Sequence, residues 1–171
     1  FPDIEALPEA PDATFLAVPK QAAIDITARL ARRGAGGVVC YTAGFSELGS
    51  AGQQAEAELV EAAGDMALLG PNCYGLINYH DRLALWPFAH GGMHPGFGAA
   101  IITQSGMLSS DLTMSQRHLP LSYMVSVGNQ ASLRLEDFID IFLEEPHVRA
   151  IGLHIASICR PCLLYTSDAA D

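Results

Sequence analysis

Basic residues are scarce in this sequence. Of its 171 residues, nine are Lys or Arg and 19 are Asp or Glu, which gives a formal net charge of −10. Nucleic-acid-binding surfaces are usually basic, so this balance argues against a nucleic-acid partner. It does not exclude a small anionic ligand, because the free N–H groups at a helix N-terminus bind phosphate without any side-chain charge.

Long apolar runs, a secretion signal and a disulfide framework are also lacking. No apolar run reaches the roughly 18 residues of a membrane-spanning helix, and no basic segment followed by an apolar one opens the chain. The four cysteines do not follow the spacing of a small secreted scaffold. We therefore expect no membrane partner and a cytoplasmic location with reduced thiols.

The fingerprint of dinucleotide-binding oxidoreductases is missing as well. No G-x-G-x-x-G follows a predicted strand with an acidic residue about 20 positions later. A nicotinamide-dependent oxidoreductase of the Rossmann type therefore has no support in the sequence.

Hydrophobic residues make up 50% of the chain, and they form strands that alternate with helices. The predicted strands are 13–18, 37–41, 66–69, 83–86, 99–103, 121–127 and 150–155, and the predicted helices are 21–33, 53–63, 107–117 and 135–143. Continuous apolar runs are typical of parallel strands that are buried on both faces. The alternation indicates βαβ units, so we predict an α/β fold with parallel sheets.

The chain divides at residues 87–97, whose glycines and prolines indicate a linker. The first unit, residues 1–86, has no glycine-rich first βα turn and begins at Phe1 rather than Met. We therefore expect its N-terminal βα units to be missing. The second unit is 98–158. Residues 159–171 break the pattern, and 162–171 resemble translated adapter sequence, so we expect a non-native tail; the Cys159-x-x-Cys162 spacing lies within it.

Glycine and small polar residues follow two of the buried strands. In an open α/β sheet, ligands bind at the carboxyl ends of the strands. We therefore expect one ligand site to be shared by the two turns, Gly70-Pro71-Asn72-Cys73-Tyr74-Gly75 and Gln104-Ser105-Gly106.

Six short motifs occur in a fixed order. They are Phe15-Leu16-Ala17-Val18-Pro19, Thr42-Ala43-Gly44-Phe45-Ser46-Glu47, Gly70-Pro71-Asn72-Cys73-Tyr74-Gly75-Leu76, Thr103-Gln104-Ser105-Gly106, Val125-Ser126-Val127-Gly128-Asn129 and Glu136-Asp137-Phe138-Ile139. Together they resemble the NDP-forming acyl-CoA synthetases, relatives of the succinyl-CoA synthetase α subunit, over nearly all of residues 1–158. The resemblance implies a partial CoA-binding, Rossmann-like domain at 1–86. It also implies the start of a flavodoxin-like succinyl-CoA-synthetase domain at 98–158.

The resemblance implies a reaction. A full-length parent would be an acid–thiol ligase that makes acyl-CoA from a small carboxylic acid, CoA and ATP, by way of an acyl phosphate and a phosphohistidine. ATP or ADP and Mg²⁺ would bind outside this chain, in an ATP-grasp domain or subunit, and the full-length protein would be an oligomer. The phosphohistidine is expected after residue 158, so we expect no catalytic residue in this chain and no activity from the chain alone.

The resemblance also implies two sets of site residues and a substrate position. The pocket for phosphate and phosphohistidine would include Asn72, Cys73, Ser105, Gly106, Met107, Gly128 and Asn129. The CoA contacts would be Pro19, Lys20, Tyr41, Thr42 and Ala43. Ser110 stands where succinyl-CoA synthetase has a substrate-contacting tyrosine, which argues against succinate. The turn Gln104-Ser105-Gly106 suits the acyl phosphate chemistry, because a helix that starts at Ser105 presents free N–H groups to a negatively charged intermediate.

Several residues have competing interpretations. Cys73 is predicted to be a small buried side chain rather than a nucleophile, and Lys20 is either a CoA contact or a solvated lysine. His90 and His94 are four residues apart but lie in the Gly/Pro-rich linker, so we expect no metal site. The family has a phosphohistidine-contacting glutamate where this chain has Ala156, so either the family sequence ends near Ile155 or this contact is absent.

One alternative function stays open. The chain is then a CoA-binding, regulatory module of a catalytically inactive synthetase-like region in a protein acetyltransferase fusion.

Overall fold

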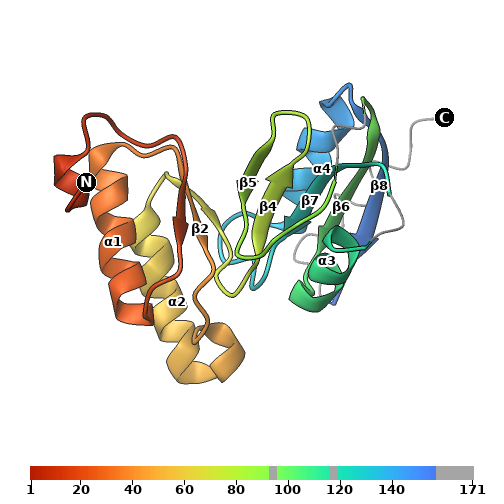
Figure 1. The fold of residues 1–171 in the computed structure, drawn as a ribbon. Coiled ribbons are helices and arrows are strands. Elements are labelled where there is room, and N and C mark those ends of the chain that lie inside the picture. Colours follow the sequence, from red (N-terminus) through yellow and green to blue (C-terminus); the bar gives the residue numbers. More distant parts are fainter. Residues whose placement is uncertain (93–95, 116–118, 157–171) are drawn as a thin grey trace.

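The computed structural model describes residues 1–92, 96–115 and 119–156, which form two lobes, each built on its own sheet (Figure 1). The first sheet has three parallel strands in the order β1-β2-β3, and the second has five in the order β5-β4-β7-β6-β8. The first three strands are β1 (Thr14–Leu16), β2 (Gly37–Cys40) and β3 (Ala67–Leu69). The other five are β4 (Gly75–Asn78), β5 (Leu83–Leu85), β6 (Gly98–Thr103), β7 (Leu121–Ser126) and β8 (Val148–His154). The predicted α/β class is confirmed.

Helices cover the sheets, as Figure 1 shows for the outer face of β1 and β2. They are α1 (Lys20–Arg33), α2 (Ser50–Ala63), α3 (Gly106–Thr113) and α4 (Leu135–Glu144), with short 3-10 turns η1 (Ile4–Ala6) and η2 (Ser46–Leu48). The first helix ends at Gly34, whose left-handed backbone lets its N–H reach the carbonyls of Leu30 and Ala31. None of the helices in the described part of the chain is both long and apolar enough to cross a membrane.

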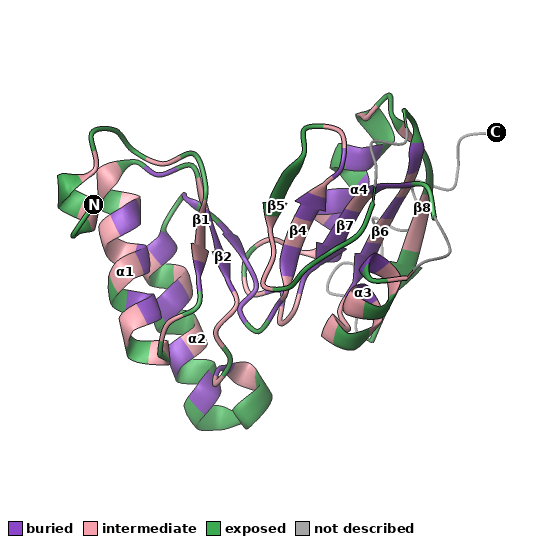
Figure 2. Cartoon of the chain, in the orientation of Figure 1, coloured by how far each residue is buried: buried purple, intermediate pink, exposed green. Residues whose placement is uncertain are grey.

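The strands of the first sheet are mainly apolar because most of their side chains are buried or half-buried on both faces. Val38 and Leu68 pack into the core under α1 and α2. Their neighbours Val39 and Leu69 point the other way and join a core that includes Val125 of the second sheet. Figure 2 shows buried residues along the strands of both lobes. Side chains that alternate between two apolar layers explain the unbroken hydrophobic runs, and the second layer joins the lobes.

The second sheet is mixed, so the prediction of parallel sheets is wrong for its edge β5-β4-β7, and β4 was not among the predicted strands. β4 runs antiparallel to both β5 and β7. A short turn joins β4 to β5, in which the Asn78 side chain donates to Asp81 at 2.7 Å and Arg82 has a φ of +54°. Antiparallel neighbours need only such a turn, whereas a parallel pair needs a long crossover. Residues 75–86 thus pair with the second sheet, although the sequence-based division put them in the first unit.

The third helix is shorter than the predicted range 107–117. It ends at Thr113, whose hydroxyl donates back to the carbonyls of Ser109 and Ser110. Hydroxyl side chains that bond the backbone weaken a helix interior. The prediction of a longer helix used hydrophobic spacing alone, which does not take these bonds into account. His94, His118, Cys159, Cys162 and the tail 159–171 lie outside the described residues.

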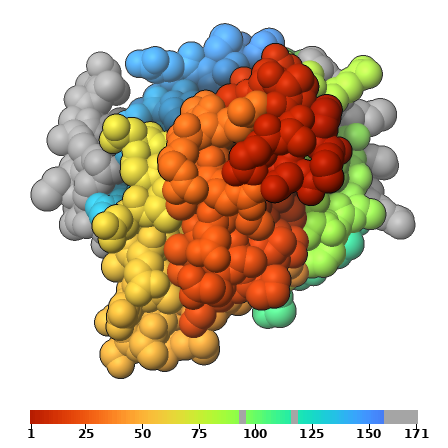
Figure 3. Space-filling model, turned by 90° about the vertical axis from the view of Figure 1, so that its left-hand side faces the viewer, coloured from red at the N-terminus to blue at the C-terminus, as the bar shows by residue number. Residues whose placement is uncertain are grey.

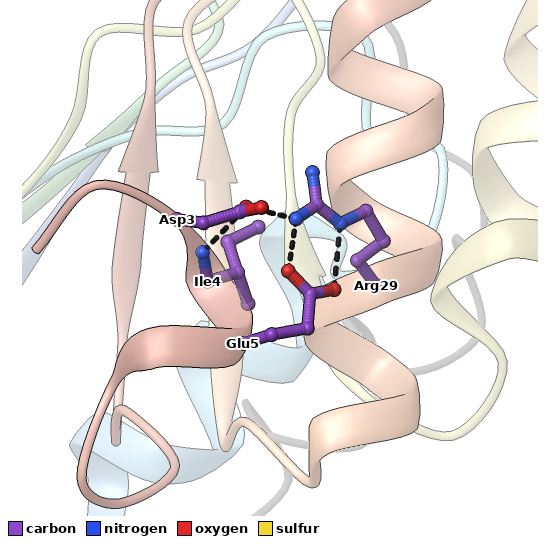
Figure 4. A network of polar contacts seen from close by, with 4 residues as sticks. All are labelled: Asp3, Ile4, Glu5 and Arg29. Atoms are coloured by element: carbon purple, nitrogen blue, oxygen red, sulfur yellow. Dashed lines mark hydrogen bonds and ion pairs between the residues drawn. The ribbon is translucent and has the colours of Figure 1, made fainter.

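The N-terminal segment lies along α1. Figure 3 views this lobe from outside, with the first residues (red) against those of α1 (orange). The Arg29 guanidinium of α1 bonds the carboxylates of Asp3 and Glu5 (Figure 4). The hydrogen bond from Arg29 is the main reason why the pKa of Glu5 falls to about 2. The ion pairs are exposed, so they hold the segment in place without adding much to the free energy of unfolding.

Candidate functional site

A cavity of about 340 Å³ lies at the carboxyl ends of the first three strands. Its lining comes from the segments that follow β1, β2 and β3, namely Ala17, Val18, Tyr41, Thr42, Ala43, Asn72, Cys73 and Tyr74. Three of these residues are predicted CoA contacts, and two belong to the predicted phosphate pocket. The fold therefore brings parts of both predicted sets to one cavity, at the sheet edge where ligands bind in open α/β folds.

Backbone and side-chain hydrogen bonds fix the rim of this cavity. The Thr42 hydroxyl donates to the Val18 carbonyl at 2.7 Å, which joins the segments after β1 and β2. The Thr42 carbonyl accepts from the Asn72 N–H at 3.0 Å, which joins the segments after β2 and β3. Since the polar groups of Thr42 hold the rim, the surface left for a ligand consists mainly of small side chains and of the rings of Tyr41 and Tyr74.

The other two predicted CoA contacts lie beside the cavity rather than in its lining. Pro19 is the N-cap of α1, and its carbonyl accepts from the Ala23 N–H at 2.9 Å. The Lys20 side chain lies close to Gly44, since a Cβ built at that glycine would stand 3.6 Å from the Lys20 Cδ. The Lys20 side chain therefore lies beside the loop that comes after β2, at the edge of the same sheet.

Cys73 is a packed thiol inside the turn 70–75. It is 1% exposed, and its Sγ lies 3.5 Å from the Cys40 carbonyl oxygen and 3.6 Å from that of Leu69. Burial raises the pKa of the Cys73 thiol well above its ordinary value, and it raises the pKa of Cys40 to about 11. The thiolate is the nucleophilic form of cysteine. This environment agrees with a structural role for Cys73.

We expect both buried thiols to resist alkylation in the folded protein. At pH 8, iodoacetamide should modify Cys40 and Cys73 at least about tenfold more slowly than after unfolding in urea, because burial disfavours the thiolate. Peptide mass spectrometry over a time course measures both rates, and the unfolded sample is the control. Equal rates in folded and unfolded protein would contradict the buried geometry.

Gly128 and Asn129 follow β7 and press against the turn 70–75. A Cβ at Gly128 would stand 2.3 Å from the Pro71 carbonyl oxygen, so only glycine permits this approach. The Asn129 N–H donates to the same oxygen at 2.9 Å. The Asn72 side chain in turn donates to the Asn129 Oδ1 at 3.3 Å. These contacts join the two predicted phosphate-pocket segments directly.

The Asn129 side chain also holds two carboxylates. Its Nδ2 donates to Glu47 at 2.6 Å and to Glu56 at 2.8 Å. Desolvation acts to raise the pKa of Glu47, but hydrogen bonds from Asn129 and from the N–H groups of Gly44 and Phe45 outweigh it, and the pKa lies below its usual value. Asn129 thus acts as a hydrogen-bonded junction between the lobes, and its contacts explain the glutamate in the motif that ends at Glu47.

The N-terminus of α3 comes to the same region by way of Tyr74. Ser105 caps the helix, since its Oγ accepts from the Leu108 N–H at 3.3 Å. A Cβ at Gly106 would stand 2.8 Å from the Tyr74 Cζ, so the tyrosine ring rests on the glycine backbone. Met107 is 75% exposed, and Ser110 donates to the Met107 carbonyl at 2.9 Å. Tyr74, which also lines the cavity, therefore links the two predicted turns, although the sequence motifs gave it no role of its own.

The described histidines do not gather at this site as a group. His154 ends β8, with its Nδ1 3.3 Å from the Thr103 Oγ1, close to the start of α3. His80 stacks on His147 with ring centroids 4.3 Å apart, at the amino ends of β7 and β8, and His90 packs edge-on against Tyr79. Within residues 1–92, 96–115 and 119–156, no group of three or more His, Cys, Asp or Glu could hold a metal ion.

Comparison with known proteins identifies the family. Residues 97–166 match the family model described as the succinyl-CoA ligase like flavodoxin domain. A trans-feruloyl-CoA synthase from an unidentified prokaryote is 35% identical over 94% of this chain and 24% of its own length. The α subunit of an ADP-forming acetate–CoA ligase II from Pyrococcus furiosus is 32% identical over 92% of this chain and 35% of its own. The chain belongs to the NDP-forming acyl-CoA synthetase superfamily.

Solved structures agree with this family. A crystal structure from Pyrococcus horikoshii superposes with a TM-score of 0.88 at 29% identity, over 95% of this chain and 38% of the other. A dinucleotide-forming acetyl-coenzyme A synthetase 1 from Ca. Korarchaeum cryptofilum, in complex with phosphate and ADP, gives 0.82 at 27% identity, over 97% and 36%. The chain thus spans 24% and 35% of the length of these two curated relatives.

Proposed function

We propose that the protein that carries this chain is an acid–thiol ligase, which converts a carboxylic acid, CoA and ATP into acyl-CoA, ADP and phosphate. Support comes from the relatives, among which are ligases named for acetate and for 4-hydroxybutyrate as ADP-forming, and from a related structure that holds phosphate and ADP. The relatives are named for different acids, trans-ferulate among them, so they leave the acid open.

The cavity at the ends of β1 to β3 would hold the arm of CoA. Ala17, Val18 and Ala43 give it narrow walls of small side chains, while Thr42 and the Asn72 turn hold its rim. These residues would bind CoA, with Pro19 and Lys20 at the edge of the sheet. CoA supplies the thiol that accepts the acyl group. The role of this chain is to hold the arm so that its end lies near the turn 70–75.

The two turns would stabilise the phosphate chemistry. Acyl phosphate formation brings several negative charges together, and fixed N–H dipoles stabilise such charge without reorganising. The N-terminus of α3 at Ser105, Gly106 and Met107 offers these dipoles, and Gly106 lets a ligand approach the backbone closely. We place the acyl phosphate between this helix and the turn 70–75, and Gly128 and Asn129 would support that turn. A histidine outside this chain would carry the phosphoryl group from ATP to the carboxylate of the acid, with Mg²⁺ bound by the nucleotide-binding part.

One observation carries the proposal. The turn 70–75, which follows β3, is in contact with three other parts of the chain. Thr42 joins it to the segments after β1 and β2, Asn129 joins it to the segment after β7, and its own Tyr74 rests on the start of α3. A cavity of about 340 Å³ beside an anion-stabilising helix end is an arrangement that suits acyl transfer between phosphate and a thiol.

Product analysis of the complete protein tests the function. Acid, CoA and ATP should give acyl-CoA together with ADP, and omission of CoA or of acid should abolish continuous ADP release, which leaves only the stoichiometric ADP that phosphorylation of the enzyme produces. Formation of AMP would contradict the proposal, since it would indicate an acyl adenylate. CoA binding with no nucleotide turnover for any acid would contradict it too, and would favour a regulatory, CoA-binding module.

A further inference from the structure

Three aromatic side chains form a continuous surface beside the site. Tyr74 contacts Phe88 with ring centroids 4.9 Å apart and an interplanar angle of 76°, and it contacts Trp86 at 5.8 Å and 89°. Both are edge-to-face contacts, the arrangement that aromatic rings prefer. We call Tyr74, Trp86 and Phe88 the aromatic wall.

One member of the wall, Tyr74, lies between the two parts of the proposed active site. Tyr74 lines the cavity after β3, where its ring centroid is 6.0 Å from that of Tyr41. The same Tyr74 ring rests on the backbone of Gly106 at the start of α3. A ligand carboxyl group held by the first N–H groups of α3 would therefore have the wall as its neighbour.

Part of this surface is open to solvent. Phe88 is 41% exposed, and Met107, which is not part of the wall but follows Gly106 in the first turn of α3, is 75% exposed. Apolar surface that stays open next to a binding cavity marks a place where an apolar group binds. The methyl group of acetate would cover little of it, whereas an aromatic ring would add a further edge-to-face or offset-stacked contact.

We propose that the aromatic wall is the acyl-group subsite and that the acid is an aromatic carboxylic acid. This inference rests on the proposed ligase function and names its substrate class. Tyr74 is then a specificity-determining residue. It orients the ring of the acid while the carboxylate meets the start of α3.

Substrate selectivity of the complete protein tests the subsite. The wild type should use 4-hydroxycinnamate with a higher kcat/KM than acetate. Phe88→Leu, at a position outside the lining of the CoA cavity, should lower kcat/KM for 4-hydroxycinnamate about tenfold and change that for acetate by less than about threefold, because only the aromatic acid loses a ring contact. Phe88→Tyr, which keeps the ring, is the matched control and should retain the selectivity.

Calorimetric binding of 4-hydroxycinnamate separates the two proposals. Tyr74→Leu should raise the Kd for 4-hydroxycinnamate about tenfold. Phe88→Leu, at the exposed rim, should raise it too, and this variant serves as the test if Tyr74→Leu fails to fold. Preference of the wild type for acetate, or equal losses for both acids, would overturn the subsite. If no acid gives acyl-CoA, the ligase function fails, while loss of binding in the variants still decides whether the wall binds aromatic acids.

Discussion

Replacing Gly128 with alanine is expected to destabilise the protein by about 3 kcal/mol and to abolish ligase activity. The new Cβ would stand 2.3 Å from the Pro71 carbonyl oxygen and 2.6 Å from that of Asn72, and the backbone there has a φ of +58°. Overpacking and left-handed strain each cost about 1–3 kcal/mol. Because the obstacles are backbone atoms, the turn 70–75 must move, and the cavity that it lines moves with it.

Gly34 provides the matched control for this prediction. It too has a positive φ, of +82°, but a Cβ there meets nothing within 4 Å. Gly34→Ala should cost about 1 kcal/mol, the price of left-handed backbone alone. Urea denaturation of both variants measures the difference. Equal losses would show that the contact between Gly128 and the turn does not contribute to stability.

Replacing Asn129 with aspartate is expected to destabilise the contact between the lobes at neutral pH, because it introduces electrostatic repulsion there. The change removes the amide that donates to Glu47 and Glu56 and puts a third carboxylate beside them. We expect the free energy of unfolding to fall by about 2 kcal/mol at pH 7. The two glutamates lose a hydrogen-bond donor, while solvent screens part of the repulsion between the carboxylates. Asn129→Ala, which removes the donor without adding charge, should cost less.

The pH dependence distinguishes the two variants of Asn129. In the wild type the pKa of Glu47 is lowered in the folded state. Its contribution to stability is therefore present above the ordinary Glu pKa of about 4.3 and is lost as the pH falls toward the folded value. In Asn129→Asp the repulsion raises carboxylate pKa values, so the gap to the wild type should narrow as the pH falls from 7 to 4. A gap that stays constant would contradict the contact between Asn129 and the glutamates.

Most of the fold could be predicted from the sequence, because buried parallel strands leave short, unbroken apolar runs. The runs at Val38-Val39 and Leu68-Leu69 serve two cores at once, and that leaves a clear signal. β4 was missed because four residues that end in Asn78 give little periodicity, and because its partner β7 is far away in the sequence. Its antiparallel pairing is a tertiary outcome, which local pattern does not encode.

The candidate site, like the fold, could be predicted only in part from the sequence. Motif order could predict that Asn72, Asn129 and Ser105 belong together, and the structure brings the first two into hydrogen-bond contact. It could not predict that Asn129 bonds Glu47 and Glu56, or that the Tyr74 ring rests on Gly106. Those contacts depend on how two sheets meet, and no short motif spans that distance.

The fate of phosphate oxygen tests the central claim most directly. The complete protein would be given acyl-CoA, ADP and phosphate labelled with ¹⁸O, and the acid that forms would be analysed by mass spectrometry. In the proposed reaction a phosphate oxygen attacks the thioester carbon, CoA leaves as the thiol, and the phosphoryl group then departs with cleavage of its P–O bond. The account predicts one ¹⁸O atom in the carboxylate for each ATP formed. ATP formation with no label in the acid, or acid release without ATP, would contradict it.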